Sequence, residues 1–172
     1  MNWELQMIYE DVSMDEKYMD AVKRKDMQSV QQMVNYVAKK NGYNFEAWHG
    51  TPNGRFNKFR VGGFGPLFFF AKEKKYAEYY AKRFLNAPDP ITLHCYLKME
   101  NPKKMEEVGQ QEDKMLAYRT RKEGFDSIET PNAYIVFMNE QIKVADPITY
   151  DKKGIIIPLS KRFDSDNDNI EY

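Results

Sequence analysis

Cysteine and histidine are scarce in this chain of 172 residues, which has one cysteine, Cys95, and two histidines, His49 and His94. A single cysteine excludes an internal disulfide framework and is typical of a reducing compartment. So few ligands also argue against a zinc site, and we expect no metal. His94 and Cys95 are neighbours in an apolar run that predicts a strand, and strand neighbours point to opposite faces. We therefore expect Cys95 in the core rather than in a Cys-His nucleophilic pair.

Net charge and long apolar runs are lacking as well. Basic and acidic residues balance at 26 each, so no overall charge draws the chain to nucleic acid or to a membrane surface. No apolar stretch approaches the roughly 20 residues that span a bilayer, and the N-terminus has no pattern of a secretory signal. We expect a cytoplasmic protein without a membrane partner. The length suits one domain with a short helical appendage.

The first 42 residues predict a helical hairpin. Ser13-Met14-Asp15-Glu16 has the form of a capping box, which predicts that a helix begins there. Asp26 predicts the cap of a second helix with apolar residues at helical spacing, and Asn41-Gly42 ends it. We expect this hairpin, residues 1–42, to pack on a second unit, residues 43–172.

From residue 43 onward short apolar segments alternate with turn residues, a pattern typical of strands. Asn101-Pro102 is expected to end the third strand, and the polar end of the chain is expected to be mobile until Ile170 and Tyr172 dock. The predicted fold class is α+β. The predicted strands are 45–48, 67–70, 91–98, 124–128 and 133–137, and the last two are expected to pair around a turn at Thr130-Pro131. The predicted helices in this part are 75–84 and 106–122.

Three segments after residue 43 contain candidate residues of a functional site. Trp48-His49-Gly50-Thr51 comes at a predicted strand end, Gly65 to Ala71 leads into the aromatic helix Tyr76 to Ala81, and Asn132 to Phe137 forms a later strand. Each alone has an ordinary explanation, because His-Gly-Thr is a common strand end and tyrosines at helical spacing usually belong to a core. Their order along the chain is the informative feature.

This order resembles the ADP-ribosyltransferases of the His-Tyr-Glu type, which include diphtheria-type toxins and poly(ADP-ribose) polymerases. The resemblance covers about residues 43–143 and implies a split mixed or antiparallel sheet that binds NAD as substrate, without a metal. His49-Gly50 matches the His-Gly of the family. Its Gly-x-x-x-Tyr-Phe-Ala strand matches Gly65 to Ala71, with Phe69 in place of the middle tyrosine. Ala133 stands where the family has its catalytic glutamate, one residue before the Tyr-Ile-Val-aromatic strand.

Other segments of the sequence support a similar resemblance. Ala47 to Thr51, Gln141-Ile142-Lys143 and the Asp146 to Asp151 segment resemble ADP-ribosyltransferase domains of phage polyvalent proteins and bacterial conflict toxins. This likeness implies a toxin or conflict effector that acts in the cytoplasm of a bacterial host, and a cognate antitoxin is compatible with it.

NAD cleavage produces an oxocarbenium-like sugar and a neutral nicotinamide, so the protein must clamp the nicotinamide and place negative charge near the cation. Gly50 has no side chain and lets the backbone approach the nicotinamide amide. His49 can hydrogen-bond a ribose hydroxyl, and Thr51 can add a hydroxyl contact.

Aromatic side chains complete the expected clamp. Either Tyr79 or Tyr80 can stack on the pyridinium ring, and Phe69 can close its other side. Adjacent helix positions differ by about 100°, so the two tyrosines cannot both face the ring, and the spacing favours Tyr80.

Ala133 has two explanations. The domain is naturally non-catalytic, or its glutamate was replaced to silence a toxic protein, and the intact motifs around Ala133 favour the second. In the family, that glutamate binds the nicotinamide-ribose 2′-hydroxyl and stabilises the cationic transition state. Glu129 precedes the turn and Glu140 lies beyond the strand, so both are weaker substitutes.

The favoured interpretation is an NAD-dependent ADP-ribosyltransferase that modifies a macromolecule, either protein or nucleic acid. Alternatives are an NAD glycohydrolase and a non-catalytic module that binds NAD or ADP-ribose. The acceptor would be chosen by loops at Asn53 to Gly63 and Val108 to Lys122. Arg55, Lys58 and Arg60 in the first loop suit a phosphate backbone but do not select one.

Overall fold

The computed structural model describes residues 3–63, 65–83, 85–109 and 114–172, with side chains from Val12 onward. The fold is α+β, with a mixed sheet of seven strands. In chain order the elements are α1 Trp3–Lys23, α2 Met27–Lys40, β1 Phe45–Thr51, β2 Phe68–Ala71, α3 Lys74–Lys82, β3 Ile91–Leu97, β4 Pro102–Lys104, α4 Leu116–Lys122, β5 Ser127–Glu129, β6 Ala133–Val136, the 3₁₀ turn η1 Asn139–Gln141, β7 Ile142–Val144 and the 3₁₀ turn η2 Leu159–Lys161.

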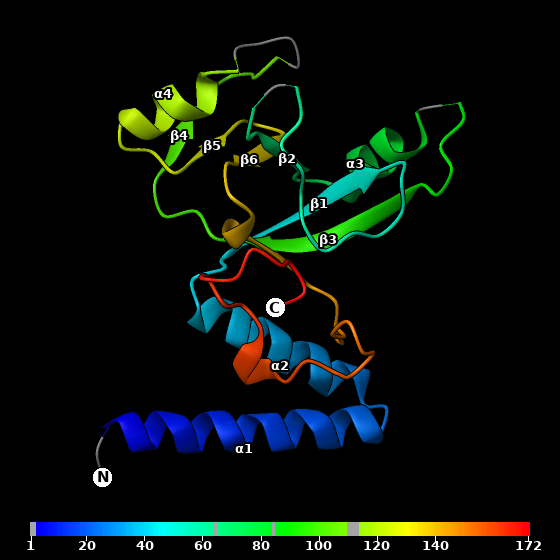
Figure 1. Cartoon of the computed structure of the whole chain (residues 1–172), viewed down its shortest axis with the longest axis vertical. Helices are drawn as coiled ribbons and strands as arrows, with labels where there is room; N and C mark the ends of the chain where they lie inside the picture. Colours follow the sequence, from blue (N-terminus) through cyan, green and yellow to red (C-terminus); the bar gives the residue numbers. More distant parts are fainter. Residues whose placement is uncertain (1–2, 64, 84, 110–113) are drawn as a thin grey trace.

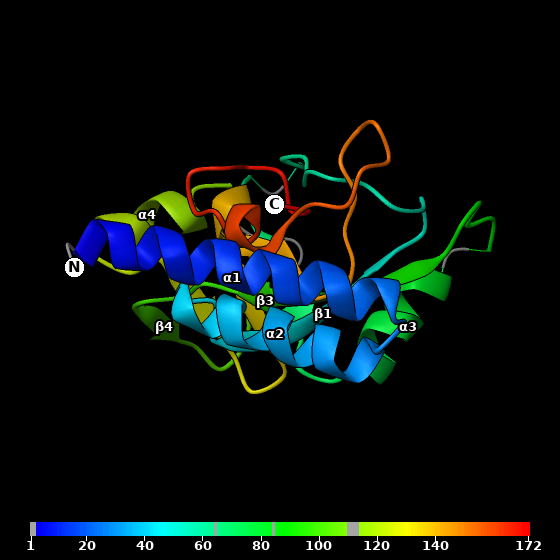
Figure 2. The ribbon, with the colours of Figure 1, turned by 90° about the horizontal axis from the view of Figure 1, so that it is seen from below.

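The helical hairpin of α1 and α2 lies on one side of the sheet (Figure 1), and the two helices run beside each other when seen from below (Figure 2). Asp26 caps α2 as predicted, because Ser29 donates its backbone N–H and its hydroxyl to the carboxylate at 3.1 and 2.7 Å. These two hydrogen bonds lower the pKa of Asp26. Gly42 follows α2 with φ +86°, the left-handed conformation that glycine adopts at a helix end.

The prediction that the first helix begins at Ser13 is wrong, since α1 begins at Trp3 and Ser13 lies inside it. The Ser13 to Glu16 segment does not cap this helix. Asp15 instead accepts hydrogen bonds from the backbone N–H and the hydroxyl of Ser160, at 2.9 and 2.5 Å. Its carboxylate therefore ties α1 to the C-terminal segment at η2.

One hydrophobic cluster joins the hairpin to the remainder of the chain. Val30 and Val34 of α2 pack with Tyr43, Leu159 and Phe163, all of them buried. Residues 1–42 therefore share a core with parts of residues 43–172. Apolar packing therefore joins the hairpin to residues 43–172. Polar contacts add to it, such as the hydrogen bond that Tyr18 Oη donates to the Pro147 carbonyl.

The strand order is β4-β5-β6-β2-β1-β3-β7. β4 and β5 are parallel, and the other neighbours are antiparallel. β1 pairs with β3 along its whole length, but its register with β2 consists of the single pair Trp48 and Ala71 in the described chain. The sheet is therefore divided between β2 and β1 into two halves that stay joined at one point.

Several predicted boundaries need correction. The first strand continues to Thr51 because Gly50 and Thr51 still pair with β3. The third strand ends at Leu97, and Pro102 begins β4, a strand that the sequence did not reveal. The helix expected at 106–122 is confined to α4, and residues 106–109 are outside any helix or strand, while 110–113 lie outside the described residues. The paired strands around Thr130-Pro131 are confirmed.

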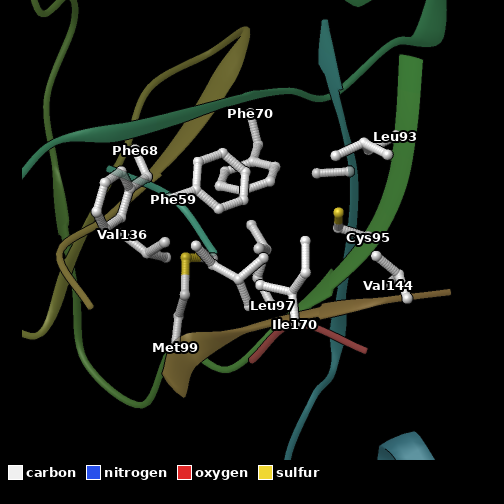
Figure 3. Close-up of a cluster of buried hydrophobic side chains, with 12 residues drawn as sticks. Phe59, Phe68, Phe70, Leu93, Cys95, Leu97, Met99, Val136, Val144 and Ile170 are labelled. Atoms are coloured by element: carbon white, nitrogen blue, oxygen red, sulfur yellow. The ribbon is translucent and has the colours of Figure 1, made fainter. Parts of the chain in front are cut away.

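The main core lies on one face of the sheet (Figure 3) and combines strand residues with two distant segments. Phe59 comes from the loop after β1, and Ile170 comes from the end of the chain. Ile170 is held by its own backbone, which accepts a hydrogen bond from Val144 N–H and donates one to the Asn57 carbonyl. Ile170 is therefore docked in the core. Cys95 is buried in this core, as predicted, and His94 lies on the other face.

Lys143 on β7 is a buried lysine that fastens the C-terminal segment. Its side chain is 1% exposed, and its ammonium donates to the carbonyls of Asn167 and Asn169 at 2.7 and 3.0 Å. Burial lowers the pKa of Lys143 from 10.5 to about 8, although Asp164, Glu140 and Asp168 nearby oppose the shift. At neutral pH the Lys143 ammonium is charged, and its burial lowers the stability of the folded protein.

Lys143→Met is expected to change how stability depends on pH. Between pH 8 and 10.5 the unfolded chain holds the Lys143 proton and the folded chain releases it, so this group raises stability as pH increases. From pH 7 to 9 the gain is about 1 kcal/mol. Burial raises the pKa of Cys95, so titration of this thiol acts in the opposite direction, but it is common to both proteins. Urea unfolding at pH 7 and 9 should show this gain in the unmodified chain relative to Lys143→Met. Equal pH dependence of both proteins would contradict it.

Candidate functional site

A cavity of about 720 Å³ opens over the division between β2 and β1. Its volume falls in the range of roughly 300–1,000 Å³ that is usual for small-molecule sites. The floor comes from β1, β2 and β6, one wall from α3, and another from the segment after β4. The lining residues are Trp48, His49, Gly50, Pro52, Phe69, Phe70, Ala71, Tyr76, Ala77, Tyr80, Arg83, Glu106, Glu107, Val108, Thr130, Asn132, Ala133 and Ile135.

Strand register places Ala133 in this floor. Trp48 on β1 is opposite Ala71 on β2, and Ala71 is opposite Ala133 on β6. Residues opposite each other point to the same face of a sheet, so these three side chains form one row across the division. Phe69 and Ile135 form the next row on the same face. The position where the family resemblance expects a carboxylate therefore faces the cavity.

His49 bridges the two halves of the sheet. Its Nδ1 lies 2.9 Å from the carbonyl oxygen of Phe69. A carbonyl cannot donate, so Nδ1 carries the proton and Nε2 keeps a lone pair. Burial lowers the pKa of His49, with a smaller opposing effect from this hydrogen bond, so the ring is neutral at neutral pH. Phe59 packs edge-on against the ring, with centroids 4.7 Å apart. In this tautomer Nε2 is a hydrogen-bond acceptor.

Gly50 is required by helix packing. A Cβ atom at this position would lie 1.9 Å from the carbonyl oxygen of Ala77 and 2.9 Å from the backbone nitrogen of Ala81. α3 therefore packs directly on the backbone of β1. This close approach brings Tyr76 and Tyr80, on the same helix face, to the cavity. The sequence had suggested ligand access as the reason for glycine, and the structure adds a reason that involves no ligand.

Tyr79 and Tyr80 differ as expected for adjacent helix positions. Tyr80 lines the cavity, and the Arg83 guanidinium lies over its ring at 4.8 Å. Tyr79 is 66% exposed and is absent from the described lining. Thr51 is also absent from that lining. Its side chain is buried, and its hydroxyl accepts a hydrogen bond from Asn53 N–H at 3.3 Å. Of the predicted residues, the structure brings together His49, Gly50, Phe69, Tyr80 and Ala133.

The two glutamates considered as substitutes for the missing glutamate lie outside the described cavity lining. Glu129 forms ion pairs with Lys104 and with Lys72, the latter at 2.7 Å, and hydrogen bonds from these lysines lower its pKa. Glu140 is in η1, where its carbonyl accepts a hydrogen bond from Tyr43 Oη at 2.6 Å. Neither residue is among the described residues of the cavity lining.

Glu106 and Glu107 are the acidic residues that do line the cavity, and the sequence did not single them out. The sequence predicts a helix over residues 106–122, and carboxylates on such a helix would belong to an ordinary solvated surface. The contacts of the neighbouring residues Met105 and Val108 place Glu106 and Glu107 at the cavity. Met105 N–H donates to the Glu129 carbonyl at 3.0 Å, which extends the pairing of β4 with β5, and Val108 packs on the cluster around Ile135.

The basic loop after β1 is neutralised by the C-terminal part of the chain. Arg55 pairs with Asp146 at 2.7 Å and with Glu171 at 2.9 Å, and Lys58 pairs with Asp168. These ion pairs weaken the case for a phosphate-binding surface at Arg55 and Lys58. They hold the loop that carries Phe59 next to His49.

No group of three or more metal-binding side chains occurs among the residues described, and none of the helices described there has the length and apolarity to cross a membrane. No family model, curated protein or solved structure matches this chain. A functional assignment therefore depends on the residues and the geometry of the cavity.

Proposed function

We propose that this chain is an NAD-binding domain of the ADP-ribosyltransferase type, with Ala133 at the position of the catalytic carboxylate. The observation that carries the proposal is the assembly of His49, Gly50, Phe69, Tyr80 and Ala133 around one cavity at a divided sheet. These residues come from four elements, and their grouping was expected from the resemblance. Their separation along the sequence makes such a grouping informative.

In this proposal each lining residue has a defined task. The nicotinamide ring lies between the aromatic surfaces of Phe69 and Tyr80, and its carboxamide meets the backbone at Gly50. His49 accepts a hydrogen bond from a ribose hydroxyl through Nε2, because Nδ1 is already committed to the Phe69 carbonyl. Cleavage would build positive charge on the ribose, and Ala133 offers nothing to stabilise it. The chain as it stands would bind NAD and turn it over slowly.

With a carboxylate at position 133, the proposed activity is transfer of ADP-ribose to a macromolecular acceptor, as expected for a toxin or conflict effector. Ala133 itself favours a second candidate, a non-catalytic module that binds NAD or ADP-ribose. Both candidates require NAD binding, and they differ in the effect of restoring the carboxylate. An NAD glycohydrolase would instead release free ADP-ribose.

The two adjacent tyrosines of α3 supply a matched test of ligand placement. Loss of one stacked ring costs about 1–3 kcal/mol by alanine substitution. Tyr80→Ala is therefore expected to weaken NAD binding about tenfold, whereas Tyr79→Ala should change it less than about twofold. Fluorescence titration with NAD, after confirming folding by circular dichroism, measures both. Equal weakening by the two substitutions would show that the ligand does not use this face of α3.

A further inference from the structure

Helix α3 has one row of side chains that faces the cavity. Ala77 and Ala81 are each 1% exposed and pack on β1. Tyr76, Tyr80 and Arg83 follow one another at helical spacing on the adjoining face, and all three line the cavity. The two tyrosines are each 42% exposed, so their rings border the cavity and are also open to solvent. A molecule bound along α3 is therefore next to the cavity.

A second row lies on the outer face of α3, opposite the face that packs on β1. It contains Lys75, Tyr79 and Lys82, which are four and then three positions apart. Tyr79 is 66% exposed, and the centroids of its ring and the Tyr80 ring are 5.9 Å apart. A planar group that stacks on Tyr79 therefore lies beside the ring at the cavity. The proposed function gives no task to this outer row.

The charge around these two rows is positive, although the whole chain has no net charge. Residues 72–83 contain five basic and two acidic residues. The two acidic residues, Glu73 and Glu78, form exposed ion pairs with lysines of the same segment at 2.7 and 3.5 Å. The described residues include no ion-pair partner for Lys82. Unlike the basic loop after β1, this face keeps an excess of positive charge for a negatively charged partner.

Single-stranded nucleic acid has the chemistry that matches these rows. Proteins bind single strands through cationic side chains that contact the phosphates and aromatic side chains on which the bases stack. A duplex keeps its bases paired and stacked, so it offers no free base to Tyr79. An acidic peptide satisfies the cations but leaves the tyrosine rings without a planar partner. Rings and cations in adjacent rows therefore favour a single strand over either of these partners.

We propose that the outer face of α3 binds single-stranded nucleic acid and holds it at the mouth of the cavity. One base stacks on Tyr79, and Lys82 and Arg83 contact phosphates. Glu106 and Glu107 line the cavity in the segment after β4 and repel phosphates, which confines the strand to the α3 side. Binding of the strand does not require NAD. Its role as the macromolecular acceptor rests on the proposed function.

The test is fluorescence anisotropy of a labelled oligothymidylate of about 12 nucleotides, titrated with the full chain in the absence of NAD. The unmodified protein should bind it with a dissociation constant of roughly 1–100 μM at low salt. Tyr79→Ala should weaken this binding about tenfold through loss of one stacked base. The same substitution is expected to leave NAD binding nearly unchanged, so the two surfaces are measured separately.

Tyr36→Ala is the matched control for Tyr79→Ala. Tyr36 is 57% exposed on α2 and is followed three positions later by the exposed Lys39, but it lies outside the described cavity lining. This substitution should leave binding of the strand unchanged. Equal weakening by both substitutions, or weakening by neither, would overturn the inference.

The dependence of binding on salt measures the phosphate contacts. Lys82→Gln should lower the slope of log affinity against log salt concentration by about 0.7, which corresponds to one phosphate contact on a single strand. Lys161→Gln is the control, because Lys161 is exposed at η2 and lies outside α3, and it should keep the slope. An unchanged slope in Lys82→Gln would contradict the proposed contact.

Competition identifies the class of partner. The same strand paired with oligoadenylate, and polyglutamate, should each compete more weakly than the free strand. Equal competition by either would overturn the inference, and polyglutamate would then assign this face to an acidic peptide. Binding of NAD without binding of the strand would overturn this inference alone. Binding of the strand without binding of NAD would overturn only the proposed function.

Discussion

Ala133→Glu is expected to convert this protein from an NAD binder into an NAD-consuming enzyme. Ala133 faces the cavity in the row formed with Ala71 and Trp48. Its backbone is held by Thr130, whose N–H donates to the Ala133 carbonyl and whose hydroxyl accepts from the Ala133 N–H. A new carboxylate would therefore project from a fixed point. We expect NAD turnover to rise about a thousandfold, or roughly 4 kcal/mol of transition-state stabilisation.

The affinity for NAD should change far less than the rate, because the charge on the ribose develops during cleavage. Ala133→Gln is the matched control, since it restores hydrogen bonding and size without negative charge, and it should recover little rate. Release of nicotinamide, measured by chromatography, follows the reaction. Labelled NAD incubated with protein and nucleic-acid pools distinguishes transfer from hydrolysis. A glutamate variant that binds NAD without cleaving it would favour the non-catalytic module.

Expression gives a cellular counterpart of the same experiment. If the proposed transferase modifies an essential macromolecule, Ala133→Glu should slow bacterial growth, whereas the unmodified chain and Ala133→Gln should not. Growth curves under an inducible promoter measure the effect. Normal growth with active, soluble Ala133→Glu protein would argue against a toxin.

Gly50→Ala is expected to destabilise the fold strongly despite adding one methyl group. The new Cβ would lie 1.9 Å from the Ala77 carbonyl oxygen, and neither this backbone oxygen nor a Cβ can move away by a side-chain rotation. β1 and α3 would have to separate. Overpacking of this kind typically costs 1–3 kcal/mol, and we expect about 3 kcal/mol because the contact is with main chain. Separation of α3 would also move Tyr80 and weaken NAD binding.

Gly63→Ala is a suitable control for Gly50→Ala. Within the described part of the chain a Cβ at Gly63 meets no atom within 4 Å, and neither glycine has a positive φ. Alanine there should be neutral or stabilising by up to about 1 kcal/mol through the unfolded chain. Urea unfolding of both variants gives the comparison. If Gly50→Ala is as stable as Gly63→Ala, α3 does not pack on β1 in the way described.

Local sequence patterns predicted the parts of the fold that depend on interactions between nearby residues. Asp26 before an amphipathic run predicted a helix cap, and the apolar strand pattern around Cys95 predicted that Cys95 lies in the core, on the opposite face from His94. The paired strands around Thr130 followed from a proline turn between apolar segments. The contrast between Tyr79 and Tyr80 followed from helix geometry alone.

Long-range contacts could not be predicted in this way. The Ser13 to Glu16 pattern resembled a helix cap, but Asp15 is used by Ser160, a residue 145 positions away. Thr51 was expected at a ligand, and continued pairing with β3 keeps it in the strand and its side chain buried. Glu106 and Glu107 had the composition of a helix surface, and the pairing of Met105 with Glu129 places them at the cavity.

The central claim is that the cavity between α3, the divided sheet and the segment after β4 binds NAD. Calorimetric titration of the unmodified chain with NAD⁺ tests it most directly, because the proposed clamp through His49, Gly50 and Tyr80 does not require a carboxylate at position 133. We predict one site per chain with a dissociation constant in the millimolar range or tighter. Folded protein that shows no binding heat at several millimolar NAD⁺ would contradict the proposed function.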